Sequence, residues 1–511
     1  MRRFTARLTC PMLLAALLVC GTTALGQVEP DDVIRSGPHT WRDILAEPHS
    51  RGLIPGALLV VKGPVWGTRV VTVGAADLAE DTPMTLDSPF RVGPLTKAMV
   101  AVALLQMETE WKVRLNQTLG ELLGDGIVPD ADKRTLYDCL FQATGLLNYR
   151  DLPEFAPDGP LANDNREWLP ESIVAMAVAA GRKTPARKPG DYFPSDTDAI
   201  LAGMVAERVD KKPLAEILDE RVIRKTGLKA TYFDTGREVP EAMTRGYTGC
   251  VRGAVPRDRT LRHPSADGAA GAVVSTPRDV LTFLETLFET RQLLSQHANA
   301  WMFKYINDYD GPRETARGAG VMERTSIRGT FRGVEGSIPG YSTCAGYYLH
   351  GDTYILLFIN TSDHPPLAQH LYDSLLRQVS GAPNRMEPKQ GASVAGPDVL
   401  LSWAAGLLYG QFHVYLGKDE AAVSRATVSS HEGARLFLAD GDTYQKQVKG
   451  LVPGETYFWR VDTFRVRPDH EMDNLRKKKE AIYRKDPALH DPFVAEEEVI
   501  TGPVFRFNVM K

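Results

Sequence analysis

Hydrophobic positions predict strands at both ends of an N-terminal region and helices between them. Two short runs rich in β-branched residues, 56–62 and 68–74, are separated by glycine and proline, which favours a hairpin. A second pair of runs, 342–349 and 353–359, predicts another hairpin near the end of the region. This order suggests an α+β domain whose terminal strands share one sheet.

Helical periodicity dominates the segment between the two hairpins. Residues 94–110 are apolar on almost every face, which is typical of a buried helix. Further helices are predicted at 196–209 and 276–290, and an opening helix falls within 27–52. The domain is therefore expected to enclose at least one helix completely.

A change of composition marks a second domain. Residues 381–397 are rich in Gly, Pro and Ala and predict a linker between domains at 27–380 and 398–511. Short strand-like runs separated by turns follow, which is typical of an all-β sandwich. These runs are 400–403, 413–416, 435–438, 457–461 and 504–507. A charged segment at 473–486 interrupts them and is interpreted as a solvated helical insertion.

The first 26 residues predict a secretory signal peptide. A basic start, an apolar run at 12–20 and small residues at 24–26 indicate cleavage near Gly26-Gln27. Lipid attachment at Cys20 is less favoured, because the valine before it is bulkier than that cleavage usually accepts. We therefore expect a secreted, periplasmic or cell-envelope protein. No later run reaches the roughly 18 apolar residues of a membrane span.

Charge and cysteine content exclude several classes of protein. The 511 residues carry 60 Lys and Arg against 64 Asp and Glu, a net charge of −4, which argues against nucleic acid as a partner. Three cysteines follow the signal peptide: Cys139, Cys250 and Cys344. None has zinc-ligand spacing, so we expect buried thiols, no metal and no cofactor, although an oxidising compartment would permit one disulfide.

Several stretches carry a resemblance to a known family and keep their order along the chain. They are Leu53–Ala57, Thr82–Thr85, Phe90–Gly93, Ala143–Leu146, Ala270–Asp279 and Pro339–Tyr341. Through them, residues 53–380 resemble the serine β-lactamase and penicillin-binding-protein family, most closely its class C and esterase-like branch. The resemblance implies an antiparallel sheet flanked by helices and, in active members, a serine hydrolase.

The first catalytic motif of that family, S-x-x-K, here reads Pro94-Leu-Thr-Lys97. The lysine is retained, but a proline occupies the position of the nucleophilic serine. Proline has neither a hydroxyl nor a backbone N–H. In the family this N–H is one of two oxyanion-hole donors, and losing one donor typically costs about 100- to 1000-fold in rate. Thr96 is the nearby hydroxyl, but it lies about 100° from Lys97 around the helix and should not face the cleft.

The second motif, Y-x-N or S-x-N, reads Pro194-Ser195-Asp196. The general-base position is therefore Pro194, and the amide has become the carboxylate of Asp196. Because Lys97 sits on an apolar helix, its ammonium needs a partner. We expect an ion pair between Lys97 and Asp196, with nitrogen and oxygen closer than about 4 Å.

The third motif, K-T-G or H-x-G, reads Val334-Glu-Gly336. Valine replaces the cation that meets a substrate carboxylate in the family. Gly336 remains, and so does Ser337, whose N–H the resemblance implies as the second oxyanion donor. Glu335 is interpreted as a strand residue facing solvent.

The loss of nucleophile, base and cation together indicates a non-catalytic family member that binds a cell-wall peptide or an envelope protein. The alternative is an active esterase- or peptidase-like serine hydrolase that uses displaced hydroxyls, with Ser195, Thr96 and Ser337 as candidates. The predicted binding residues are Lys97, Ser195, Asp196, Gly336 and Ser337.

The C-terminal domain carries a second, weaker resemblance. Leu401-Ser-Trp403, Leu451–Val461 and Gly502–Phe507 are similar to strands of a fibronectin type III module. Such modules act as spacers or adhesion units, and their aromatic residues are expected in the core.

Overall fold

The structure is a computed structural model. The residues it describes are 41–155, 166–182, 189–190, 192–236, 242–251, 253–290, 292–307, 315–326, 329–381, 384–388, 392–404, 411–427, 434–439, 445–466, 497–500 and 504–510. The predicted signal peptide at 1–26 and the charged segment at 473–486 lie outside them.

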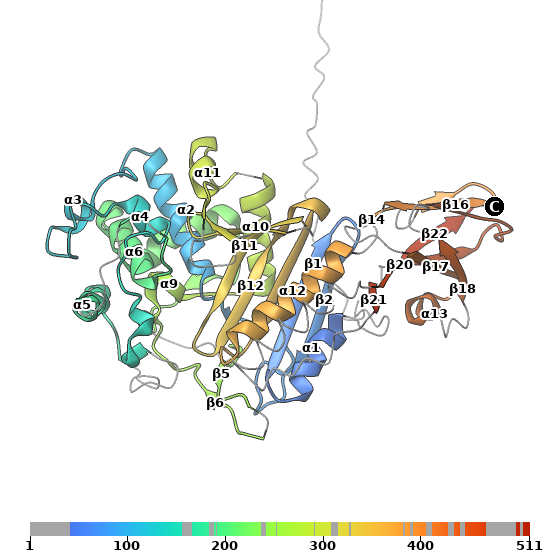
Figure 1. Cartoon of the computed structure of the whole chain (residues 1–511), viewed down its shortest axis with the longest axis horizontal. Helices are drawn as coiled ribbons and strands as arrows, with labels where there is room; N and C mark the ends of the chain where they lie inside the picture. Colours follow the sequence, from blue (N-terminus) through green and yellow to red (C-terminus); the bar gives the residue numbers. More distant parts are fainter. Residues whose placement is uncertain are drawn as a thin grey trace, which may run out of the picture. The chain divides into compact units, whose positions relative to one another are not determined.

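An eight-stranded antiparallel sheet forms the centre of the N-terminal region (Figure 1). Both predicted hairpins are present, and β1 pairs with β13, so the terminal strands share one sheet as expected. From edge to edge the strands are β2 (Gly67–Gly74), β1 (Gly56–Gly63), β13 (Thr353–Ile359), β12 (Tyr341–Tyr348), β11 (Gly329–Ile338), β10 (Met322–Ser326), β9 (Thr315–Arg317) and β8 (Ile306–Asn307).

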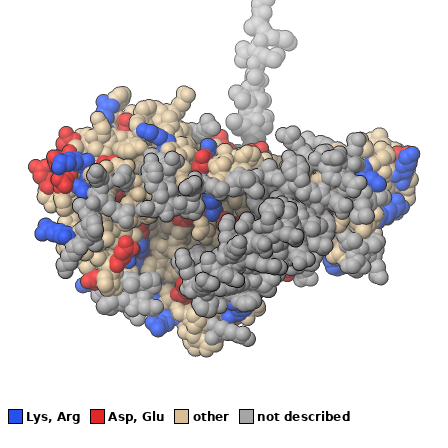
Figure 2. Space-filling view, in the orientation of Figure 1, with Lys and Arg blue, Asp and Glu red and all other residues tan. Residues whose placement is uncertain are grey.

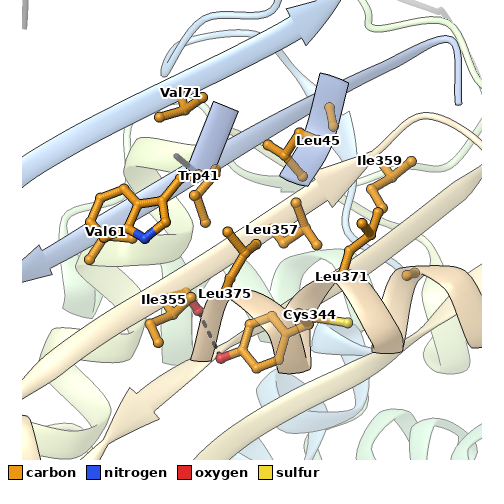
Figure 3. Packing of buried hydrophobic residues seen from close by; sticks show 14 of the residues in the cluster. Trp41, Leu45, Val61, Val71, Cys344, Ile355, Leu357, Ile359, Leu371 and Leu375 are labelled. Atoms are coloured by element: carbon orange, nitrogen blue, oxygen red, sulfur yellow. Dashed lines mark hydrogen bonds between the residues drawn. The ribbon is translucent and has the colours of Figure 1, made fainter. Parts of the chain in front are cut away.

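Helices cover both faces of this sheet. On one face, α1 (Trp41–Ser50) and α12 (Pro365–Gly381) pack against alternate residues of the central strands, and Figure 3 shows Leu371 and Leu375 beside Leu357. Lys62 points to the other face, where it pairs with Glu285 of α10 (Pro277–Glu285). Because both faces are covered, β1 and β13 are continuous apolar runs.

The helical part of the domain surrounds α2 (Leu95–Thr109). Every residue of α2 from Leu95 to Met107 is buried except Lys97, which confirms the predicted buried helix. Further helices are α3 (Leu119–Leu123), α4 (Leu136–Leu140), η1 (Tyr149–Asp151), η2 (Pro153–Phe155), α5 (Pro170–Gly181), α6 (Asp196–Asp210), α7 (Leu214–Leu218), η3 (Asp219–Ile223), α8 (Arg224–Thr226), η4 (Pro264–Ala266), α9 (Gly268–Gly271), η5 (Thr286–Thr290), α11 (Gln296–Met302) and η6 (Leu349–Gly351). Short strands pair as β3 (Phe90–Arg91), β7 (Val273–Ser275) and β4 (Tyr232–Phe233), and as β5 (Tyr247–Thr248) with β6 (Arg257–Asp258).

Two sheets form the C-terminal region and share one apolar core. The smaller sheet comprises β14 (Asn384–Glu387), β16 (Val399–Ala404) and β19 (Gln445–Val448). The larger comprises β15 (Ala392–Val394), β22 (Phe505–Val509), β20 (Thr456–Val466), β17 (Gln411–Gly417) and β18 (Ala434–Ala439), with β21 (Glu497–Ile500) on β20 and α13 (Glu420–Arg425) after β17. The predicted sandwich is present, and its kinship with fibronectin type III modules stays a prediction.

The predicted linker requires a correction. Within 381–397, residues 384–387 form β14 and residues 392–394 form β15, and both pair with strands of the C-terminal region. Proline and glycine are common beside short edge strands as well as in linkers, so composition alone did not separate the two. The β-rich region therefore begins before residue 398.

The three cysteines Cys139, Cys250 and Cys344 are free and buried, as expected. In the described part of the chain, no helix has the length and apolar character needed to span a membrane.

Candidate functional site

Two of the predicted motif stretches meet at the beginning of α2, beside the outer edge of β11. β10 pairs with β11 only as far as Gly333, so the following residues face α2. A methyl group built on Gly336 would lie 2.6 Å from Cγ of Pro94. Gly336 also has a φ of 152°, in a region that favours glycine. The ring of Pro94 therefore fills the space directly beside the third motif.

Pro94 fits its position without strain. Its φ of −58° and ψ of −15° are helical, and its carbonyl accepts a hydrogen bond of 3.0 Å from the N–H of Lys97. The N–H groups in the first turn of a helix have no acceptor within the helix, so proline loses no intrahelical hydrogen bond there. Proline keeps the helix but supplies neither a hydroxyl nor an N–H at this position.

The predicted ion pair between Lys97 and Asp196 is present, and both side chains are largely buried, at 20% and 15% exposure. Asp196 opens α6 and also accepts a hydrogen bond from Nε of Arg150. Burial alone would raise the pKa of the Asp196 carboxyl, but Lys97 and Arg150 outweigh burial and lower this pKa to about 2. The carboxylate is therefore ionised at neutral pH and binds two cations.

The ion pairs continue away from Lys97. Nη1 of Arg150 lies 2.7 Å from Oδ1 of Asp267, and Nη1 of Arg262 lies 2.7 Å from Oδ2 of the same carboxylate. Cations and anions thus alternate along a chain from α2 through α6 and η1 to the turn before α9, which we call the ion-pair chain. Among the described residues, Lys97 is thus engaged in an ion pair with Asp196 and not in a contact with a hydroxyl.

A second buried contact secures the start of α6 next to the ion-pair chain. The hydroxyl of Thr144 donates to Oδ1 of Asp198 at 2.5 Å, and its N–H donates to Oδ2 at 3.2 Å. Burial raises the pKa of Asp198 well above the usual value of an aspartate. The N–H of Asp196 donates to the side-chain oxygen of Asn148 at 3.1 Å. The stretch 143–148 therefore positions the carboxylates of α6.

The three candidate replacement hydroxyls lie elsewhere. Thr96 is fully buried and its Oγ1 accepts from the N–H of Val273 at 3.1 Å. Oγ of Ser337 lies 2.8 Å from Oγ of Ser342 on the neighbouring strand. Ser195 is 1% exposed, and its hydroxyl has no hydrogen-bond partner among the described residues. Within the described part of the chain, none of the three hydroxyls is hydrogen-bonded to Lys97.

A cavity of about 70 Å³ lies between α2, the end of α4 and the β9–β11 edge of the sheet. Pro94, Lys97 and Val334 line it, together with Arg317 and Glu335. Pro194 and Ser195 do not, and Pro194 is exposed, so the second motif reaches the cavity only through the contact of Asp196 with Lys97.

The prediction that Glu335 faces solvent is wrong. Its side chain is 17% exposed and lies 3.7 Å from Nη2 of Arg324. Burial raises the pKa of this carboxyl, against the opposing effect of Arg324 and Arg317. The sequence of β11 alone does not show which neighbours, such as Arg324, cover Glu335.

Sequence reasoning missed Arg317, which lines the cavity, and three residues of the ion-pair chain, Arg150, Arg262 and Asp267. Two of them could have been found, because Arg150 follows the stretch Ala143–Leu146, which carries the resemblance, by only four residues. Asp267 likewise precedes the stretch Ala270–Asp279 by only three residues. Arg262 comes from a loop and Arg317 from the short strand β9, and neither segment shows a motif.

Surface charge and metal-binding groups add little to this site. Figure 2 shows Lys and Arg intermixed with Asp and Glu over the helical part of the face drawn. Among the described residues, no three His, Cys, Asp or Glu side chains are grouped to hold a metal ion.

The antiparallel sheet, its covering helices and the buried lysine-bearing helix beside β11 define the β-lactamase and transpeptidase-like class of domains. The family model described as Beta-lactamase matches residues 41–379, and the chain belongs to this family.

Among solved structures, the D-stereospecific amidohydrolase from Streptomyces sp. is 28% identical, with a TM-score of 0.56 over 63% of this chain and 94% of that one. The D-amino acid amidase from Ochrobactrum anthropi SV3, complexed with D-phenylalanine, is 25% identical, with a TM-score of 0.56 over 66% and 98%. The octameric penicillin-binding protein homologue from Pyrococcus abyssi is 16% identical with a TM-score of 0.57 over 83% and 97%, a likeness of fold alone.

Among curated proteins, an uncharacterized protein of Mycobacterium tuberculosis is 25% identical over 255 residues, which cover 46% of this chain. The match spans 63% of the length of that relative.

Proposed function

We propose that this protein is a secreted, non-catalytic member of the β-lactamase family that binds a peptide or an envelope protein in its cleft. The observation that carries the proposal is Pro94, whose ring lies against Gly336 where an active member needs a serine hydroxyl and an N–H. A covalent acyl intermediate cannot form on this side chain.

The surroundings of Lys97 support the same proposal. An active site of this type needs an amine that can accept a proton from the nucleophile, and here the Lys97 amine is engaged in an ion pair with Asp196. The hydroxyls of Thr96 and Ser337 are engaged in other hydrogen bonds. The ordered cleft would then serve recognition, with the C-terminal sandwich as a spacer or adhesion unit.

The alternative is a working hydrolase with displaced residues. The names of two similar enzymes, a D-stereospecific amidohydrolase and a D-amino acid amidase, would make D-amino acid amides the substrates to assay. Ser195 favours this alternative most, because its buried hydroxyl has no partner among the described residues.

Covalent labelling separates the two functions. The purified protein would be treated with a fluorescent penicillin and with a fluorophosphonate and measured by intact-protein mass spectrometry, with the Streptomyces amidohydrolase as the positive control. We expect no adduct on this protein, together with saturable, non-covalent binding of cell-wall peptides. An adduct on any serine contradicts the proposal and assigns the nucleophile.

The variant Pro94→Ser tests how much of the machinery is missing. It restores the S-x-x-K spacing and one N–H, but neither the base nor the cation of the other two motifs. We expect slow acylation by an activated ester without efficient turnover, measured as a burst that is not followed by a steady rate. Turnover equal to that of an active family member would show that the other two motifs matter less than proposed.

A further inference from the structure

The turn that ends α2 holds a tryptophan in a conformation that suits glycine. The N–H of Trp111 donates to the carbonyl of Glu108, and the N–H of Lys112 donates to the carbonyl of Met107, each at 3.0 Å. These two bonds form a Schellman motif, in which the residue after the C-cap is left-handed and is usually glycine. Here that residue is Trp111, with a φ of 62°. A bulky side chain strains the backbone in this conformation.

Folding gains little from this tryptophan. Trp111 is 71% exposed and is the one aromatic residue among the exposed large hydrophobic residues of the described chain. Of the other five described non-glycine residues with positive φ, three are aspartates, which adopt this conformation more readily. A side chain that is both strained and exposed is better explained by a ligand than by packing.

Arg114 adds a cation without a counterion to the exposed ring. Its guanidinium carbon lies 3.7 Å from the centroid of the Trp111 ring, and its backbone N–H donates to Oε1 of Gln117 at 2.7 Å. Among the described residues, the guanidinium of Arg114 forms no ion pair, and the carboxylate of Glu110 nearby in the chain is bound by Arg221. We call the indole and this guanidinium the Trp111–Arg114 platform.

The residues around the platform favour one kind of ligand. Val113 and Leu115 are buried and the other residues of 110–117 are polar, so the indole stands alone among polar side chains. A bilayer or a protein partner would need a wider apolar area. A sugar ring has a face of C–H groups and a rim of hydroxyls, which matches an aromatic face with polar surroundings. A guanidinium binds a carboxylate through two parallel N–H bonds.

We propose that the Trp111–Arg114 platform binds a carboxylate-bearing sugar, with the sugar ring on the indole and the carboxylate on the guanidinium. The platform lies away from the cavity, because Lys97 is near the start of α2 and the helix extends 15 residues, or about 22 Å. The proposal is therefore independent of the non-catalytic function above, which covalent labelling decides.

The test measures the binding of four sugars to the full chain by saturation-transfer NMR and calorimetry. Glucuronate is matched with glucose, and N-acetylmuramate with N-acetylglucosamine, so that only the first member of each pair carries a carboxylate. At least one acidic sugar should bind with a millimolar Kd, and its neutral counterpart should bind at least about fivefold more weakly. No binding of either acidic sugar, or equal binding within both pairs, overturns the proposal. Tighter binding of tetraglutamate than of either acidic sugar also overturns it and assigns the platform to an acidic protein segment.

Two variants separate binding from stability. Trp111→Gly removes the ring but suits the left-handed conformation, so it should weaken binding at least about tenfold while changing the midpoint of thermal unfolding by less than about 2 °C. Arg114→Gln should lower the affinity for the acidic sugar to that of its neutral counterpart. The matched control is Asp81→Gly, which relieves a φ of 49° at another exposed residue and should leave binding unchanged. Unchanged affinity in Trp111→Gly, or an equal loss in Asp81→Gly, overturns the proposal. A clearly lower unfolding midpoint of Trp111→Gly would show that the ring serves the fold and would overturn it as well.

Discussion

The helices beside the cavity, which we call the helical wall, and the strands beside it, which we call the sheet wall, differ in how their buried charges are compensated. On the helical wall, Asp196 and Asp267 each bind two cations, and the pKa of both carboxyls is lowered despite their burial. On the sheet wall, Glu335 lies 3.7 Å from Arg324 with an unused acceptor atom, and burial raises its pKa. Buried carboxylates are thus compensated in the ion-pair chain, which reaches the cavity at Lys97, and only partly compensated at Glu335.

This difference separates charges that stabilise the fold from a charge that does not. The compensated charges begin at Lys97 and tie the helices together. An incompletely compensated carboxylate costs stability, so Glu335 is expected to contribute less to the fold than the ion-pair chain does. The predictions below test each wall separately.

The largest expected effect is that of Asp196→Ala. It leaves both Lys97 and Arg150 without their shared anion, and breaking one side of a buried pair typically costs about 3–5 kcal/mol of unfolding free energy. Urea unfolding measures this loss. The control is Asp219→Ala, which removes an exposed pair with Arg224 and should cost at most about 1 kcal/mol. Equal losses in the two variants would show that the ion-pair chain does not stabilise the fold.

The pH dependence of the unfolding free energy also tests the helical wall. The folded-state pKa of Asp196 is about 2, below the ordinary 3.8, so its contribution is complete above about pH 4 and is lost as the pH falls through 2. The difference of nearly two pKa units corresponds to about 2 kcal/mol. The unfolding free energies of the native protein and Asp196→Asn should therefore differ at neutral pH and converge near pH 2. A constant difference across this range contradicts the assignment.

The two walls also differ in how well the sequence predicted them. The Lys97–Asp196 pair was predictable because the spacing of the first motif places Lys97 on the buried helix and the second motif supplies one nearby carboxylate. Arg150 and Asp267 are 117 residues apart, and only the tertiary fold brings them together. Glu335 was misjudged because its exposure depends on Arg324 and on the helix α12 packed nearby, and not on its own strand.

The fold shows the same limit. The buried helix and both hairpins are predicted from local hydrophobic periodicity, which can be seen directly in the sequence. The sequence does not predict strands β14 and β15, because three or four residues between prolines and glycines carry too little pattern to show a sheet partner. Short elements such as these are specified by their neighbours.

A smaller effect is expected for Thr144→Val, which removes a neutral donor from the helical wall. The hydroxyl donates to Asp198 and accepts from the N–H of Leu146 at 3.2 Å. Both bonds are lost while the bond from the N–H of Thr144 to Asp198 remains, so the expected cost is about 1–3 kcal/mol. Thr325→Val, at an exposed threonine that pairs with Thr330 at 3.2 Å, is the matched control and should be nearly neutral. A cost as large as that of Asp196→Ala would mean that Asp198 is as important to this wall as the ion-pair chain.

The smallest expected effect has the opposite sign. Glu335→Gln should raise the unfolding free energy at pH 7 by up to about 1 kcal/mol, because glutamine removes a buried charge that is only partly compensated. The folded-state pKa of Glu335 lies above its ordinary value of 4.5, so the native protein loses stability as the pH rises above 4.5, and the variant does not. The advantage of the variant should therefore vanish below pH 4.5, where the native side chain is neutral in both states. Urea unfolding at pH 4 and pH 7 measures this reversal. If Glu335→Gln destabilises the protein at pH 7, then Arg324 or Arg317 compensates Glu335 in the folded state, and the two walls of the cleft do not differ in the way described.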